Sequence, residues 1–130
     1  MPHFIVEYTG NLKAEGRIPE LLQKASQVLQ AQDGIFAMPG IRCRAIQVDE
    51  YYIADGDPEN AYIHAHFKIG PGRSSEEIKR ALDALFEMMK DHFKDQCERR
   101  GIALSLEFTE LGAHSRYRHG NLHERMKLKS

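Results

Sequence analysis

Several features are scarce or missing in this sequence, and each absence narrows what the protein can be. Tryptophan does not occur, and only Cys43 and Cys97 among the 130 residues are cysteines. They are far apart and form no CxxC pair, which favours reduced thiols over a disulfide framework. No apolar run approaches 18 residues, and no charged segment followed by an apolar one begins the chain. We therefore expect a soluble, cytoplasmic protein that neither spans a membrane nor is secreted.

An excess of one charge is also missing, since the net charge is −1, but the charge is unevenly distributed. From Ala113 onward there are five Lys or Arg residues and one Glu. We interpret this segment as a basic C-terminal extension, solvated or packed against a partner. A nucleic-acid arm is the alternative, but nucleic-acid binding normally needs a broader basic face. The length fits one domain, residues 1–130, which would bury roughly two-thirds of the surface of its unfolded chain.

The common motifs for metal and cofactor chemistry are absent. The chain has no HExxH, no P-loop, no GxSxG and no GxGxxG sequence. Seven histidines include the pairs His64 and His66, and His119 and His123, but no further ligand at a recognised spacing completes a zinc site. We expect structural or interface histidines, no metal and no cofactor.

Periodic patterns do predict regular elements. Residues 61–69 alternate between apolar and polar side chains, as expected of a half-buried strand. Ser74 precedes Glu76 and Glu77 and a 3.6-residue apolar stripe, which indicates a helix start. The pattern predicts strands at 3–8, 41–54, 61–69 and 103–110, and helices at 18–30 and from 75 to just before Gly101.

The order of these elements is βαβ followed by βαβ, with similar spacings in the two halves. Strand start to helix start is 3 to 18 in the first half and 61 to 75 in the second. Right-handed crossovers would place both helices on one face of a four-stranded sheet, an α+β fold. The other face would carry Tyr62, His64 and His66, which are bulky for a solvated surface. We therefore expect a homo-oligomer that associates through this face.

Pro2 is the first candidate for chemistry. Met1 before a small residue is expected to be removed, which would leave a secondary amine at the N-terminus. Because the first strand begins at residue 3, this amine would lie at the end of a rigid element. Many chains begin with Met-Pro, so an ordinary residue beside a start codon is the alternative.

Two arginines are candidates for binding an acidic substrate near Pro2. Arg42 opens the second strand, which is the parallel partner of the first, so it could lie near the same end of the sheet. Arg73 belongs to a loop with Gly70 and Gly72 that leads into the second helix, and its guanidinium suits a carboxylate. A surface ion pair for Arg42 and a simple turn for the loop are the alternatives.

An arginine near Pro2 would also change the acidity of the amine. A terminal amine has an ordinary pKa of about 7.7 to 8.0, so at neutral pH it would be mostly protonated and could not act as a base. One guanidinium about 6 Å away opposes protonation by roughly 3 kcal/mol at an effective dielectric near 20, which is about two pKa units. Arginine would therefore keep the amine neutral as well as hold a carboxylate.

Taken together, these segments resemble the 5-carboxymethyl-2-hydroxymuconate isomerase family of the tautomerase superfamily. The resemblance rests on the order and spacing of four stretches, namely Pro2 with residues 3–7, residues 40–42, residues 68–74 and residues 104–108. It implies a homotrimer without a cofactor, in which Pro2 moves a proton on an unsaturated carboxylate and Arg42 and Arg73 bind and polarise it. The basic extension from about residue 113 has no clear counterpart.

The function implied by the resemblance is conversion of 5-carboxymethyl-2-hydroxymuconate, or a similar unsaturated 2-hydroxy polycarboxylate, to its 2-oxo isomer. This step belongs to aromatic-compound (homoprotocatechuate) degradation. Three alternatives remain open. They are a related proline-based tautomerase or dehalogenase acting on another small acid, a non-catalytic ligand-binding protein of the same fold, and a small nucleic-acid-binding module.

Overall fold

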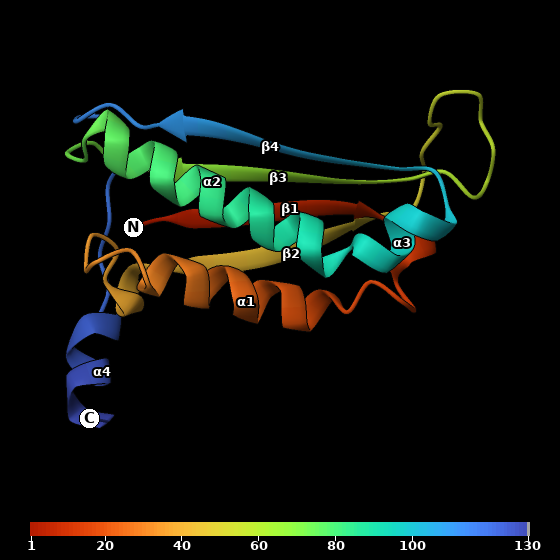
Figure 1. Ribbon diagram of the computed structural model, residues 1–130. Coiled ribbons are helices and arrows are strands. Elements are labelled where there is room, and N and C mark those ends of the chain that lie inside the picture. Colours follow the sequence, from red (N-terminus) through yellow and green to blue (C-terminus); the bar gives the residue numbers. More distant parts are fainter. Residues whose placement is uncertain (130) are drawn as a thin grey trace.

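The computed structural model describes residues 1–129 as a four-stranded sheet with two long helices packed on one face (Figure 1). The sheet order is β2-β1-β3-β4. The strands are β1 (His3–Thr9), β2 (Arg42–Val48), β3 (Ala61–Ile69) and β4 (Ile102–Glu110). The helices are α1 (Ile18–Gln30), α2 (Ser75–His92), α3 (Lys94–Arg99) and α4 (Leu122–Lys129), with short 3-10 turns η1 (Gly10–Leu12) and η2 (Met38–Gly40).

The pairing of the strands confirms the predicted pair of βαβ units. β1 and β2 are parallel, β3 and β4 are parallel, and β1 and β3 join the two halves antiparallel. Alternate residues of β3 are fully buried beneath the helices, as the alternating pattern predicts. The predicted α+β fold is therefore confirmed, and both helices cover one face.

The apolar stripes of α1 and α2 explain why these helices pack on the sheet. Leu21 and Leu29 of α1 and Leu85 and Met89 of α2 are fully buried against the side chains of β1 and β3. α2 begins with a capping box, in which the Glu77 amide donates to the Ser74 hydroxyl and the Ser74 amide donates to the Glu77 carboxylate. This cap determines where the loop that carries Arg73 ends.

The predicted second strand, residues 41–54, is too long. β2 ends at Val48 because its partner Thr9 is the last residue of β1, so further residues have no strand to pair with. The chain then turns through Ala54 and Gly56, whose φ angles are positive. Asn60 ties this loop by donating to the Ile53 carbonyl and the Asp55 carboxylate.

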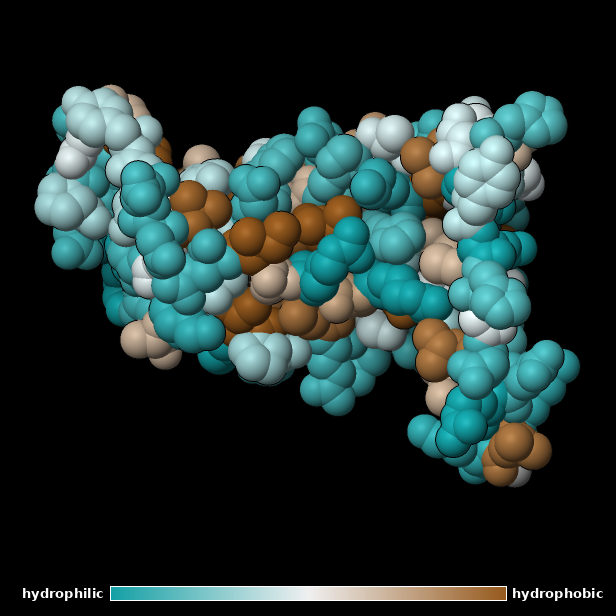
Figure 2. Space-filling model, turned by 180° about the vertical axis from the view of Figure 1, so that it is seen from behind, coloured by the Kyte–Doolittle hydropathy of each residue, from teal (hydrophilic) through white to brown (hydrophobic). Residues whose placement is uncertain are grey.

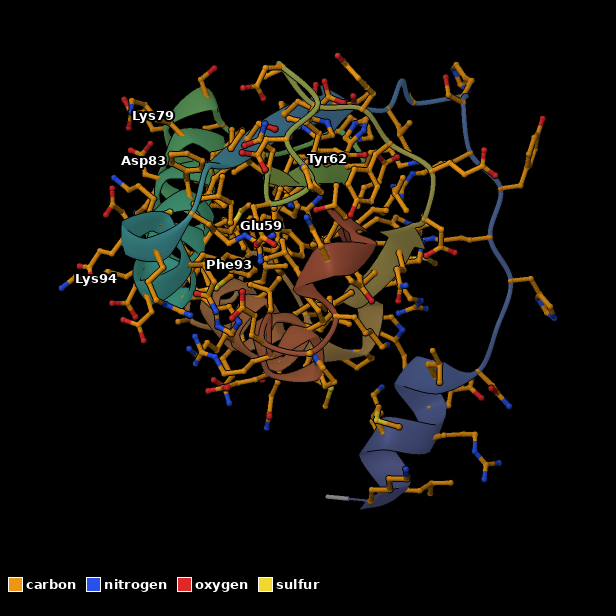
Figure 3. The ribbon with its side chains drawn as sticks, turned by 90° about the vertical axis from the view of Figure 1, so that its right-hand side faces the viewer. Glu59, Tyr62, Lys79, Asp83, Phe93 and Lys94 are labelled. Carbon is orange, nitrogen blue, oxygen red and sulfur yellow. The ribbon has the colours of Figure 1, made fainter. Side chains whose placement is uncertain are left out.

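The prediction of one continuous second helix up to Gly101 is also wrong. The helix breaks at Phe93, which has a non-helical φ of −103° and separates α2 from α3. The Phe93 side chain is fully buried and its ring meets the His92 ring edge-on. The break turns the end of the helix inward, and Figure 3 places Phe93 toward the interior while Lys79 and Asp83 lie on the outer side of α2.

The basic extension ends in a helix, α4, that the periodicity of the sequence did not predict. After β4 the chain crosses the end of the sheet at which β1 begins, and α4 then contacts η2 beside β2 (Figure 1). α4 buries none of its residues within the chain. Among the described residues, no helix is both long and apolar enough to cross a membrane.

The face of the sheet opposite the helices is uncovered within one chain. Figure 2 shows apolar areas gathered near the middle of this side, with polar side chains between and around them. Ile46 is 50% exposed there, and Tyr62 projects from the sheet on this side, away from α2 (Figure 3). His64 contacts Ser105 and Glu107, and the hydrogen bond between His64 and Glu107 lowers the pKa of that carboxyl. We refer to this surface as the open face.

Candidate active site

Pro2 lies at the beginning of β1 and is buried. Its carbonyl oxygen accepts a hydrogen bond of 2.9 Å from the Arg42 backbone amide, which joins the start of β1 to the start of β2. Gly40 lies close by, since a Cβ added there would be 3.7 Å from Pro2 Cδ. The N-terminus is therefore anchored to two neighbouring segments.

Arg42 lies at the same end of the sheet, as the parallel pairing predicts. It pairs with His3 in the register of β1 and β2. Its Nη1 donates to the Pro39 carbonyl at 2.8 Å, so the side chain bends back toward η2. The expected proximity of Arg42 and Pro2 is present in the structure.

Arg73 is held in place by the loop between α1 and β2. Its Nη2 and Nε both donate to the Ile35 carbonyl, at 2.9 and 3.3 Å, and its guanidinium stacks over the Phe36 ring at 4.8 Å. Phe36 is itself buried. This support orients the guanidinium before any ligand arrives.

Two further arginines, Arg116 and Arg118, come from the basic extension, and sequence reasoning missed them. The Arg116 guanidinium lies directly over Gly70, where an added Cβ would be 2.5 Å from Arg116 Cζ. Both arginines influence the N-terminal amine electrostatically. The only sequence signal was the Arg-Tyr-Arg stretch itself, because an irregular segment has no periodicity that would place it.

This environment makes the N-terminal amine unusually acidic. With Met1 present, the pKa of the amine falls from 8.0 to about 6. Burial is the largest cause, followed by Arg116, Arg73, Arg118 and Arg42. Within residues 1–129, none of these four arginines forms an ion pair with a carboxylate, whereas Arg100 pairs with Glu15. Glu77 and Glu110 act electrostatically on Arg73 but form no ion pair with it. The end of the sheet is thus positively charged, and no carboxylate of the described residues is paired with these four arginines.

Cys43 and His3 are two other potentially reactive side chains near this site. Cys43 follows Arg42 but points into the core side of the sheet, and burial raises the pKa of its thiol to about 11. Among the described residues, no three His, Cys, Asp or Glu side chains are grouped as metal ligands. Arg44 contacts His3 at 3.0 Å on the open face.

The surface grooves beside α2 do not include Pro2. Two grooves of 440 Å³ lie between α2 and β4, and both are lined by Leu82 and Phe108. Arg73 lines one of them, but Pro2 lines neither. The candidate site is therefore identified by its chemistry, an anchored amine among arginines, and not by the size of a cavity.

Comparison with known proteins shows the family. Residues 2–126 match the family model described as 5-carboxymethyl-2-hydroxymuconate isomerase. The chain belongs to this family of isomerases. It is 42% identical over 127 residues to the 5-carboxymethyl-2-hydroxymuconate Delta-isomerase of Escherichia coli, covering 98% of this chain and 100% of that protein.

Solved structures agree on the fold. A 5-carboxymethyl-2-hydroxymuconate isomerase from Deinococcus radiodurans is 44% identical with a TM-score of 0.91, over 96% of this chain and 93% of that chain. A structure described as a fused 4-OT symmetric trimer is 12% identical with a TM-score of 0.69, over 91% and 92%. That more distant likeness shows the fold alone.

Proposed function

We propose that this protein is an isomerase that converts 5-carboxymethyl-2-hydroxymuconate, or a similar unsaturated 2-hydroxy polycarboxylate, to its 2-oxo isomer. The observation that supports this most directly is the anchored N-terminal amine beside Arg42, Arg73, Arg116 and Arg118, which have no carboxylate partners among the described residues. A cationic site of this kind suits a small molecule that bears several carboxylates. The family assignment adds the substrate class.

The reaction requires one proton to leave oxygen and one to arrive at carbon. After removal of Met1, the neutral Pro2 nitrogen takes the proton from the 2-hydroxy group of the dienol. Electrons move along the conjugated chain, the C–O bond becomes the 2-oxo group, and the proton returns at a distant carbon, which leaves the Pro2 amine neutral again. The double bonds shift without any net loss of atoms or electrons, so no redox cofactor is required.

Arg42 and Arg73 have the role of binding and polarising the acidic substrate. Each guanidinium donates several hydrogen bonds and remains charged, so it neutralises a carboxylate and stabilises the negative charge that develops on the enolate oxygen. Arg73 is held by the Ile35 carbonyl and the Phe36 ring, so little reorganisation is needed when substrate binds. The same positive charge keeps the proline amine neutral.

We further propose that the protein acts as a cytoplasmic homotrimer in the breakdown of aromatic compounds. The uncovered open face, with Ile46 half exposed, supports association, and a structural neighbour of the same fold is described as a symmetric trimer. A small carboxylate is the expected partner, and neither nucleic acid nor a membrane is expected.

The test compares wild-type protein with Pro2→Ala in an ultraviolet assay of 5-carboxymethyl-2-hydroxymuconate. Alanine is also small enough to permit removal of Met1, which mass spectrometry checks in both proteins. We expect wild-type turnover and a loss of at least about 100-fold in kcat for the variant, the range typical of a general base. Unchanged turnover in processed Pro2→Ala would exclude the proline mechanism.

Each alternative function predicts a different experimental result. A related tautomerase or dehalogenase would turn over another small unsaturated acid in a substrate panel but not this one. A ligand-binding protein of the same fold would bind polycarboxylates without converting any of them. Retention on RNA or DNA that weakens with salt would indicate the nucleic-acid alternative.

A further inference from the structure

Arg116 differs from its neighbours in the basic extension. Residues 112–115 and 117–120 are exposed, but Arg116 is half-buried. Its guanidinium covers Gly70 in the loop between β3 and α2, and the three atoms closest to an added Gly70 Cβ all belong to it. The exposed basic extension therefore places the Arg116 side chain at the end of the sheet.

This placement brings two guanidinium groups together. Arg73 Nη1 donates to the Gly70 carbonyl at 3.5 Å, and the Arg116 guanidinium covers the same glycine. Arg116 also lowers the pKa of Arg73, an effect second only to burial. Like charges repel. Glu77 and Glu110 offset part of this repulsion at Arg73, but neither guanidinium forms an ion pair among residues 1–129. By contrast, the half-buried Arg100 pairs with Glu15 and also donates to the Glu59 carbonyl.

Two neighbouring guanidiniums that form no ion pair with a carboxylate of the described residues make a suitable site for an external anion. The guanidinium N–H groups that do not point at the Ile35 carbonyl can donate to a carboxylate, and a bound carboxylate would relieve the repulsion between the two groups. Arg42 lies on the β2 side of Pro2, whereas Arg73 and Arg116 lie at the β3 end and in the extension. The positive charge is thus divided between two sides of the amine.

We propose that Arg116 is a substrate-binding residue that, together with Arg73, holds a second carboxylate and makes the site selective for polycarboxylates over acids with fewer carboxylates. This inference rests on the proposed function for the identity of the substrate. It assigns a role to the C-terminal extension, which would deliver a binding group to the proline site.

The position of Gly70 gives an independent way to test this role. Its backbone is not in the left-handed region, so alanine is conformationally allowed there. The added methyl group would be 2.5 Å from Arg116 Cζ and 2.6 Å from Nη2, so the guanidinium must move away. Gly70→Ala should therefore remove the contribution of Arg116 without removing its charge from the chain.

The experiment measures binding by calorimetry at constant ionic strength, with the processed full-length protein. The probes are tricarballylate, with three carboxylates, and glutarate, with two. We expect Arg116→Gln to weaken tricarballylate binding about tenfold, as for loss of a charged hydrogen bond, and glutarate binding much less. Arg125→Gln, which removes an exposed charge of α4 in the same extension, is the matched control and should bind both probes as the wild type does.

Gly70→Ala should reproduce the loss seen with Arg116→Gln, and the double variant should be no weaker than either single variant. Equal tricarballylate affinity in Arg116→Gln and Arg125→Gln would overturn the proposal, as would additive losses in the double variant. Failure of the wild type to prefer tricarballylate over glutarate would also overturn it. These binding results do not depend on turnover, so a wild type that binds selectively but converts no muconate would refute only the proposed reaction.

Discussion

At the scale of single residues, the surroundings of the N-terminal amine predict how turnover depends on pH. Burial and four arginines lower the pKa of this amine from 8.0 to about 6 in the chain that keeps Met1. Pro2 is buried at the same end of the sheet, so the same causes act on its nitrogen after processing. Because only the neutral amine is a base, kcat/KM should rise with pH, with a midpoint below the ordinary value of 8.0, and then level off. A profile of kcat/KM against pH tests this, and a midpoint at or above 8.0, the ordinary value, would contradict it.

The two cysteines should differ in reactivity for a similar physical reason. Burial raises the pKa of Cys43 to about 11, so its thiol stays protonated and sheltered near neutral pH, whereas Cys97 is exposed on α3. Brief treatment of the folded protein with iodoacetamide should modify Cys97 and leave Cys43 free, as read by peptide mass mapping. Denatured protein, in which both thiols should react, is the control. Equal labelling of both thiols in the folded state would show that Cys43 is accessible.

At the scale of elements, the start of α2 connects stability with the site. The Ser74 hydroxyl accepts from the Glu77 amide at 3.1 Å, directly after Arg73. Ser74→Ala should lower the free energy of unfolding by about 1 kcal/mol, the usual effect of losing an N-cap. Urea denaturation at a fixed protein concentration measures it. Ser75→Ala, at the first helical residue, should have a much smaller effect, and equal losses would show that the cap is not the cause.

At the scale of the whole molecule, the open face predicts assembly. The proposed homotrimer should have a mass three times the 14.9 kDa of one chain, measured by light scattering. Ile46 is half exposed on the open face, and a charged side chain in its place should be unfavourable at a subunit contact. Ile46→Glu should therefore shift the mass toward that of one chain. Leu128→Glu, on the exposed surface of α4, is the matched control. A wild-type mass of one chain would refute the trimer.

The sequence by itself determined the elements whose signals are local. Alternation in residues 61–69 and the 3.6-residue stripes of α1 and α2 depend only on which side chains must be buried, so they predicted the sheet and the two helices. Arg42 could be placed near Pro2 because parallel pairing follows from a βαβ connection. The resemblance to the isomerase family, which the family model confirms, rested on residues in these strands and in the turns directly beside them.

The tertiary structure decided what depends on contacts between distant segments. β2 ends at Val48 because Thr9 ends its partner strand, and the second helix breaks at Phe93, which the core buries completely. Arg116 reaches Gly70 only because the chain after β4 crosses the end of the sheet where β1 begins. No local pattern in an irregular, basic segment specifies such a path. Nor does a local pattern specify the pKa of the N-terminal amine, since burial and the charges of arginines from three separate segments determine it.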